Sequence, residues 1–161
     1  MPDHVSKTIA AAVATRLALI LTTGTYAPGG SGSESYKTNA GNNVSSWRDL
    51  DSAPWTHDDN FPAINVRDVG ADDDEGTMGI ALHYHRINFE CDIAAGTIDT
   101  LRNMAGDIYG AVFSDEKWSA AANRTDWQGY TLDTTHAENK LFGGVVRFAI
   151  LTKTARGNPY G

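Results

Sequence analysis

Three histidines are the side chains in this sequence whose spacing could bind a metal ion. His83 and His85 are separated by one residue in a segment with strand-like alternation, which places both imidazoles on one face, and His136 could be a third ligand. The sequence contains no second ligand pair at metal spacing. A small zinc-dependent enzyme or binding module using His83 and His85 is therefore a distant alternative, and we expect no metal and no cofactor.

Four consecutive acidic residues, Asp72, Asp73, Asp74 and Glu75, invite the question of a calcium site. An EF-hand loop needs ligands at alternate positions, a glycine at the sixth position and a glutamate at the twelfth, and the surrounding sequence has none of these. We expect these carboxylates to form the solvated tip of a hairpin.

The sequence also lacks the patterns that mark a catalytic centre. Cys91, the single cysteine, has no partner motif that would mark a nucleophile, so a buried and inert thiol is expected. No G-x-S-x-G elbow occurs, and the glycine-rich segment 29–37 lacks the G-K-[ST] ending of a phosphate-binding loop. We expect no catalytic residue and no enzyme activity.

A long strand must position the histidines and the acidic residues. From Met78 to Tyr84 the apolar side chains occupy even positions, whereas beyond Arg86 they occupy odd positions as far as Ile93. One inserted residue would produce that change, so the sequence predicts a β-bulge or a sharp bend near His85 and Arg86.

Helical and strand-like patterns before and after this strand predict a single α+β domain over residues 1–161. Thr97 is the expected N-cap of an amphipathic helix, because apolar residues follow it at helical spacing. We expect two helices packed on a mainly antiparallel β-sheet. The other elements that the patterns predict are a helix over 4–21, a short strand from 64, and strands over 127–136 and 146–150.

Residues 22–62 show no regular pattern and predict a long inserted loop. A connection of this length in a compact domain is usually functional or disordered. Trp47, Trp55 and Tyr36 could anchor it, because aromatic side chains bury a large area at low entropic cost. We favour an arm that lies on a neighbouring subunit; the alternative is that the aromatic residues fold back on their own core.

The charge distribution limits the partners. The net charge is −7, so the surface repels phosphate backbones and tight binding of nucleic acid is not expected. The apolar run over 9–21 is too short to span a bilayer. From Asn139 onward the chain has basic residues and no acid, which predicts a basic edge strand carrying Arg147 and Lys153. This edge could meet the acidic hairpin tip of a neighbouring copy.

The chain resembles the tail terminator proteins of long-tailed bacteriophages, the family that includes the lambda tail terminator. The resemblance covers most of the chain except residues 22–60. It is carried by the opening helix 9–21, the strand entry Phe-Pro-Ala-Ile-Asn-Val at 61–66, the acidic hairpin, the long strand, the helix 98–113, and the closing strand Gly-Gly-Val-Val-Arg-Phe-Ala-Ile at 143–150 that ends in Thr-Lys-Thr at 152–154.

The resemblance implies a structural virion protein of the phage neck, assembled in the host bacterial cytoplasm. Such proteins form a hexameric ring that caps the tail tube, ends tail polymerisation and offers a surface to the head-completion (stopper) protein. DNA would pass through the lumen without specific binding, and no membrane is involved. The nearer alternative is another neck component, a head–tail joining or tail-completion protein. The candidate subunit-interface residues are Asp72, Asp73, Asp74, Glu75, Arg147, Lys153, Trp47 and Trp55.

Overall fold

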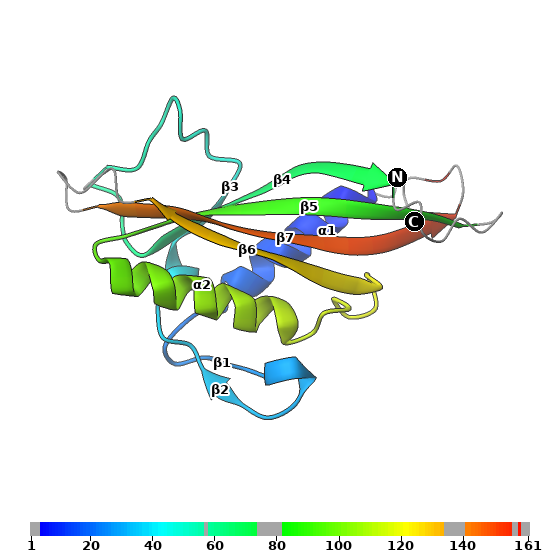
Figure 1. Ribbon diagram of the computed structural model, residues 1–161, viewed down its shortest axis with the longest axis horizontal. Coiled ribbons are helices and arrows are strands. Elements are labelled where there is room, and N and C mark those ends of the chain that lie inside the picture. Colours follow the sequence, from blue (N-terminus) through cyan, green and yellow to red (C-terminus); the bar gives the residue numbers. More distant parts are fainter. Residues whose placement is uncertain (1–3, 57, 74–81, 134–140, 156–157, 159–161) are drawn as a thin grey trace.

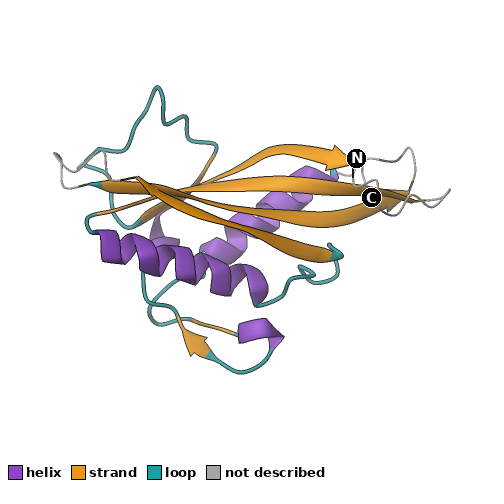
Figure 2. Cartoon of the chain, viewed as in Figure 1, coloured by secondary structure: helices purple, strands orange, loops and turns teal. Residues whose placement is uncertain are grey.

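The computed structural model describes residues 4–56, 58–73, 82–133, 141–155 and 158 (Figure 1). Figure 2 shows the same view by secondary structure, with the helices below and behind a long sheet. The elements, in chain order, are α1 (Val5–Leu17), β1 (Thr25–Tyr26), the 3₁₀ turn η1 (Pro28–Gly30), β2 (Glu34–Ser35), the 3₁₀ turn η2 (Ala40–Asn43), β3 (Val44–Ser46), β4 (Ala63–Asp73), β5 (Leu82–Ala95), α2 (Ile98–Phe113), β6 (Arg124–Asp133) and β7 (Phe142–Ala155).

The main sheet has five strands in the order β3-β4-β5-β7-β6. β3 runs parallel to β4, and the other neighbours are antiparallel. β5 and β7 pair along all 14 residues of each strand, a length of about 45 Å. The predicted α+β class with a mainly antiparallel sheet is therefore confirmed for the described part of the chain.

β5 separates two different environments. Its odd-numbered residues, such as Ile87 and Phe89, point to the inner face, which the two helices cover, and the Phe89 ring stacks on Phe148 of β7 at 5.3 Å. Its even-numbered residues, such as Glu90, point to the opposite, outer face. Pairing with β7 is unbroken from Leu82 to Ala95.

The predicted bulge near His85 and Arg86 is therefore wrong. Tyr84 lies on the outer face of a continuous strand, so the change of parity in the sequence reflects apolar residues on both faces rather than an inserted residue. The register shifts lie on the neighbouring strands instead, between Asp68 and Gly70 of β4 and between Trp127 and Gly129 of β6.

Both helices cover the inner face. α1 packs over the β3–β4 side and α2 over β5, β7 and β6. Thr97 caps α2 as predicted, accepting a hydrogen bond from Thr100 N. α1 ends at Leu17, earlier than predicted, because the chain turns there and Gly41 N bonds Ile20 O. No described helix is long and apolar enough to cross a membrane.

The prediction of one long inserted loop over residues 22–62 is not confirmed, because short strands and 3₁₀ turns interrupt this segment. The first part forms the β1–β2 hairpin and then runs through η2 into β3, and Tyr36 and Ala40 lie in the core of the same chain. The hairpin of residues 25–35, here the inner hairpin, stands beyond α2, whereas residues 47–56 and 58–59, here the outer loop, rise from the opposite side of the sheet (Figure 1). Contact of either part with a neighbouring subunit stays a prediction.

A buried carboxylate fixes the inner hairpin to α2. Asp107 is 2% exposed and accepts hydrogen bonds from Lys37 N, Thr38 N and the Thr38 hydroxyl, the shortest at 2.7 Å. At Gly110, one turn further along α2, a side chain would come within 2.7 Å of the Tyr26 ring. The helix therefore holds the hairpin through one carboxylate and one close aromatic contact.

We predict that Asp107→Ala lowers the free energy of unfolding by about 3 kcal/mol, because buried donors that lose a charged acceptor keep their full desolvation cost. Chemical denaturation followed by circular dichroism measures the change. Asn103→Ala, on the exposed face of the same helix, is the matched control and should change stability by less than about 0.5 kcal/mol. Equal effects of the two substitutions would contradict this role of Asp107.

Candidate functional site

A row of ion pairs crosses the outer face of the sheet. Arg67 of β4, Glu90 of β5 and Arg147 of β7 are direct cross-strand neighbours in the register. The Glu90 carboxylate accepts hydrogen bonds from both guanidinium groups, from Arg67 Nη2 at 3.2 Å and from Arg147 Nε at 3.0 Å. Arg67 also binds both oxygens of Asp92, at 3.0 and 3.1 Å. The charges on this part of the face are therefore paired within the chain.

A second charged group lies on the same face nearer the β6 edge. Arg86 Nη1 bonds Asp126 Oδ2 at 2.7 Å, and Arg124 Nε bonds Asp126 Oδ1 at 3.1 Å. Burial opposes ionisation of Asp126, but the hydrogen bonds from the two arginines outweigh it and lower the pKa of this carboxyl. Asp126 therefore stays ionised and joins β5 to β6.

Asn65 attaches the outer loop to the sheet. Its side chain is fully buried on the outer face of β4, where the amide oxygen accepts from Arg48 N at 2.9 Å and the amide nitrogen donates to Arg48 O at 2.9 Å. The same nitrogen donates to Asp92 Oδ2. The Asn65 side chain thus bonds the Arg48 backbone as a neighbouring strand would, and its bond to Asp92 links the outer loop to β5.

Arg48 then closes the outer loop on itself. Its guanidinium forms a two-pronged pair with Asp59, at 2.8 and 3.0 Å, and also donates to the carbonyl oxygens of Ala53 and Pro54. Hydrogen bonds from Arg48 and from Thr56 N lower the pKa of Asp59 from 3.8 to about 2. The loop is therefore a preformed feature held by charge-assisted hydrogen bonds.

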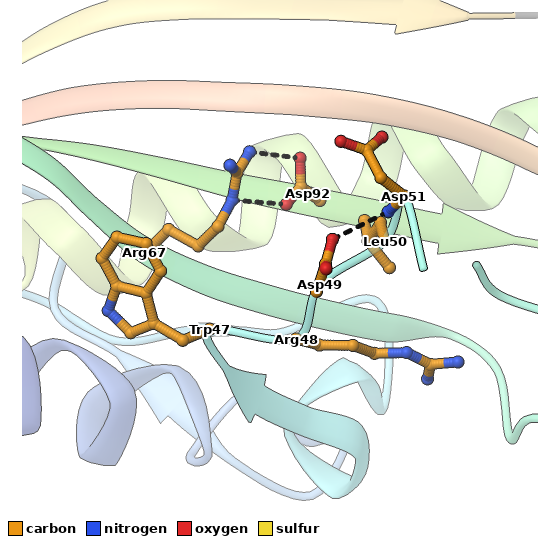
Figure 3. A pocket seen from close by; sticks show the side chains of 7 residues that line it. All are labelled: Trp47, Arg48, Asp49, Leu50, Asp51, Arg67 and Asp92. Carbon is orange, nitrogen blue, oxygen red and sulfur yellow. Dashed lines mark hydrogen bonds and ion pairs between the residues drawn. The ribbon is translucent and has the colours of Figure 1, made fainter. Parts of the chain in front are cut away.

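A pocket of about 350 Å³ lies between the outer loop and the sheet (Figure 3). Figure 3 shows the Arg67 guanidinium turned to Asp92, and Asp49 bonded to the backbone N–H of Asp51. Most of the residues that line this pocket are charged, and Arg67 and Asp92 are paired with each other. The pocket is lined by Trp47, Arg48, Asp49, Leu50, Asp51, Arg67 and Asp92.

The two predicted tryptophan anchors lie in the outer loop. Trp47 has a left-handed backbone (φ 58°), is 59% exposed, and donates its indole N–H to Asp68 Oδ1 at 2.8 Å. Trp55 is half-buried, and its ring centroid lies 6.0 Å from the Arg48 guanidinium carbon. Both side chains contact their own chain, and Trp47 still offers most of its surface to solvent.

The predicted basic edge strand is wrong. β7 lies inside the sheet between β5 and β6, because β6 pairs with it and takes the edge. Arg147 is paired with Glu90, and Lys153 is exposed opposite Tyr84. The order of strands depends on long-range pairing, which the charge pattern of one strand does not reveal.

The predicted acidic hairpin tip lies largely outside the described residues. Asp72 is on β4 and accepts a hydrogen bond from Asn88 Nδ2 at 2.8 Å, and Asp73 ends the strand. Asp74 and Glu75 lie outside the described residues. The contact of this tip with a neighbouring subunit stays a prediction.

The histidine pair lies on the inner face at the N-terminal end of β5. The His83 and His85 rings stack at 4.6 Å, and His85 Nε2 is 3.0 Å from the Thr154 hydroxyl. The described residues contain no cluster of three or more metal-binding side chains, and His136 lies outside them. Cys91 is fully buried as predicted, and this burial raises the pKa of its thiol.

Sequence reasoning missed the residues that build the outer face. One signal was present: Asn65 and Arg67 alternate on one strand of the predicted hairpin, and Glu90 and Asp92 alternate on the other. Opposite charges at matching alternate positions favour cross-strand pairs. The closure of the outer loop by Arg48 and Asp59 has no comparable signal, because both residues lie in an irregular segment.

Comparison with known proteins identifies no family for this chain: no protein-family model matches it, and no curated protein matches it.

We predict that the carboxyl of Asp59 titrates near pH 2 and that Arg48→Ala returns its pKa most of the way to 3.8. Because the pKa in the folded protein is lowered, the stabilisation of the outer loop is complete above the unfolded value and is lost as the pH falls through the folded value. Carbon-detected NMR titration of the side-chain carboxyl measures both pKa values.

The carboxyl of Asp49 is the reference in the same spectra, because hydrogen bonds from Ser52 and Asp51, and not from Arg48, lower its pKa. An Asp59 pKa that does not respond to removal of the guanidinium would show that Arg48 does not close the loop.

Proposed function

We propose that this protein is a structural component of the neck of a long-tailed bacteriophage: a ring subunit that caps the tail tube, ends tail polymerisation and presents a surface for head attachment. The resemblance of the sequence to tail terminator proteins suggests the role. The observation that carries the proposal is the pair of anchored projections, the inner hairpin and the outer loop, on opposite sides of one sheet (Figure 1).

The inner hairpin is exposed at its tip and held tightly at its base. Residues 28–35 are all exposed, whereas the tilted rings of Tyr26 and Tyr36 lie 5.0 Å apart and the Asp107 carboxylate accepts from Thr38 N, just after β2. Ala27 N also donates to the Ser114 hydroxyl at the end of α2. A tip on a fixed base can contact a second protein without first ordering the whole segment, which reduces the entropy lost on binding.

The outer loop, on the other side of the sheet, is also held at its ends and exposed between them. Asn65 and the Arg48–Asp59 pair fix its two ends, while residues 51–54 and Trp47 remain exposed. An exposed tryptophan beside hydrogen-bonding groups is typical of the centre of a protein–protein interface. The subunit therefore offers two preformed contact surfaces that face in opposite directions.

This arrangement suits a subunit of a ring between two other components. In a ring of six copies, related by head-to-tail contacts, one projection would face the tail tube protein and the other the head-completion protein. The net charge of −7 would let DNA pass through the lumen without binding to it. The same projections would also suit a head–tail joining or tail-completion protein, and position in the particle distinguishes these roles.

We predict that shortening each projection removes a different assembly step. Residues 28–33 are replaced by Asn-Gly in one variant and residues 50–55 by Gly-Ser-Gly in the other, and both should keep a cooperative thermal transition. Each variant is supplied to phage-producing cells that lack the wild-type protein. One should give overlong tails, and the other tails of normal length that do not join heads, as seen by negative-stain electron microscopy.

Asn103→Ala is the control for general effects on the α2 surface and should support normal particles. Normal particles from both shortened variants, or localisation of the protein away from the tail–head junction by cryo-electron microscopy, would reject the proposed function. Location on the head side of the terminator position would select the head–tail joining alternative.

A further inference from the structure

β6 forms one open edge of the sheet. It spans ten residues, Arg124–Asp133, of which all but Gln128 at the bulge have partners on β7, and no other described strand pairs with its opposite side. A strand of this length with an open edge is a template for pairing with another chain, and proteins usually guard such edges with charges, proline or bulges. β6 contains no proline, and its bulge lies in the middle of the strand, between Trp127 and Gly129. Its charged residues are Arg124 and Asp133 near the two ends and Asp126, which Arg86 and Arg124 bind.

Aromatic side chains gather beside this edge, where β6 meets α2. The Tyr109 ring is 4.8 Å from that of Phe113 and packs edge-on against Trp127 at 5.0 Å. Tyr130 follows Trp127 on the inner face of β6, and Tyr109 and Tyr130 are 49% and 50% exposed. These rings form a partly exposed apolar surface, which indicates a contact that the single chain does not complete.

The sequence of β6 is complementary to itself when read antiparallel. With the bulge at the centre, Arg124 comes opposite Asp133, Asp126 opposite Thr131 and Trp127 opposite Tyr130. Residues that come opposite each other must also lie on the same face of the sheet. Arg124 and Asp133 both lie on the outer face, and Trp127 and Tyr130 both lie on the inner face, as their partners on β7 show. Opposite charges directly across an antiparallel pair stabilise it, and aromatic pairs do the same.

We propose that two copies of this chain pair through β6 about a two-fold axis and join their five-stranded sheets edge to edge. At each end of the contact, Arg124 lies opposite Asp133 of the partner subunit. In the middle, Trp127 and Tyr130 pack against the same two residues of the partner subunit, and Tyr109 covers them from α2. Gly129 leaves room where the two bulges meet.

This inference does not depend on the proposed neck function. A two-fold contact uses the same surface on both copies and closes on itself, so it cannot extend into a ring. It therefore describes the free protein before assembly. A ring subunit released from this dimer would expose β6 for other use.

Analytical ultracentrifugation and native mass spectrometry of the purified full chain over a concentration series test the proposal. The wild-type protein should show a monomer–dimer equilibrium. Arg124→Asp and Asp133→Arg should each raise the dimer dissociation constant at least about tenfold, because each places two like-charged pairs across the symmetric contact. The doubly substituted chain should regain dimerisation to within about threefold of wild type. These effects should shrink at high salt.

Arg102→Asp on the exposed face of α2 is the matched charge control and should leave the dimer unchanged. Thermal unfolding checks that each variant is folded, and Tyr130→Ser provides a second, uncharged substitution that should also weaken the dimer.

A monomer at every concentration up to several hundred micromolar would overturn the proposal. A dimer that the single charge changes do not weaken, or one that the double change does not restore, would also overturn it. None of these outcomes bears on the position of the protein in a phage particle.

Discussion

The structure depends on the requirement that buried polar side chains keep their hydrogen bonds. Asn65 of β4 and Asp107 of α2 are both almost completely excluded from solvent, on opposite sides of the sheet, and both form hydrogen bonds with segment 22–62. An amide or carboxylate left unpaired in these positions would cost several kcal/mol. Because their partners are mostly backbone groups, the two side chains fix the path of the main chain in this segment. The inner hairpin and the outer loop follow from these two anchors.

The two faces of the sheet are stabilised in different ways. On the inner face Phe89 and Phe148 stack in a continuous apolar core, and burial of such side chains supplies about 1.5–3 kcal/mol each. On the outer face Arg67, Glu90 and Arg147 pair at the surface, and partly exposed pairs of this kind contribute only about 0.2–1 kcal/mol each. The outer pairs therefore add little to the free energy of unfolding. Their main effect is to neutralise the charges in the middle of the outer face.

Local signals in the sequence predicted the local structure well. The Thr97 cap, the helix that follows it and the inner-facing residues of β5 were predicted because each depends on spacing within one element. The strand order was not, because the position of β7 inside the sheet depends on β6 returning to pair with it. The bulge was misplaced for a related reason, since apolar residues on both faces of β5 imitate an insertion. In segment 22–62 the anchors are hydrogen bonds between residues far apart in the chain, which leave no periodic pattern.

The two edges of the sheet differ in a way that supports opposite roles for them. On the β4 side, β3 pairs with residues 64–66, Trp47 N bonds Val66 O, and the bulge at Asp68–Gly70 follows directly, so the edge is covered and then distorted. On the β6 side the bulge is central, Arg124 stands at one end beside its partner Asp126, and Asp133 stands at the other end. Guarding charges of one sign would repel a second copy. Opposite charges placed symmetrically about a bulge instead repel a parallel neighbour and accept an antiparallel copy, so the β6 edge selects one orientation of one partner.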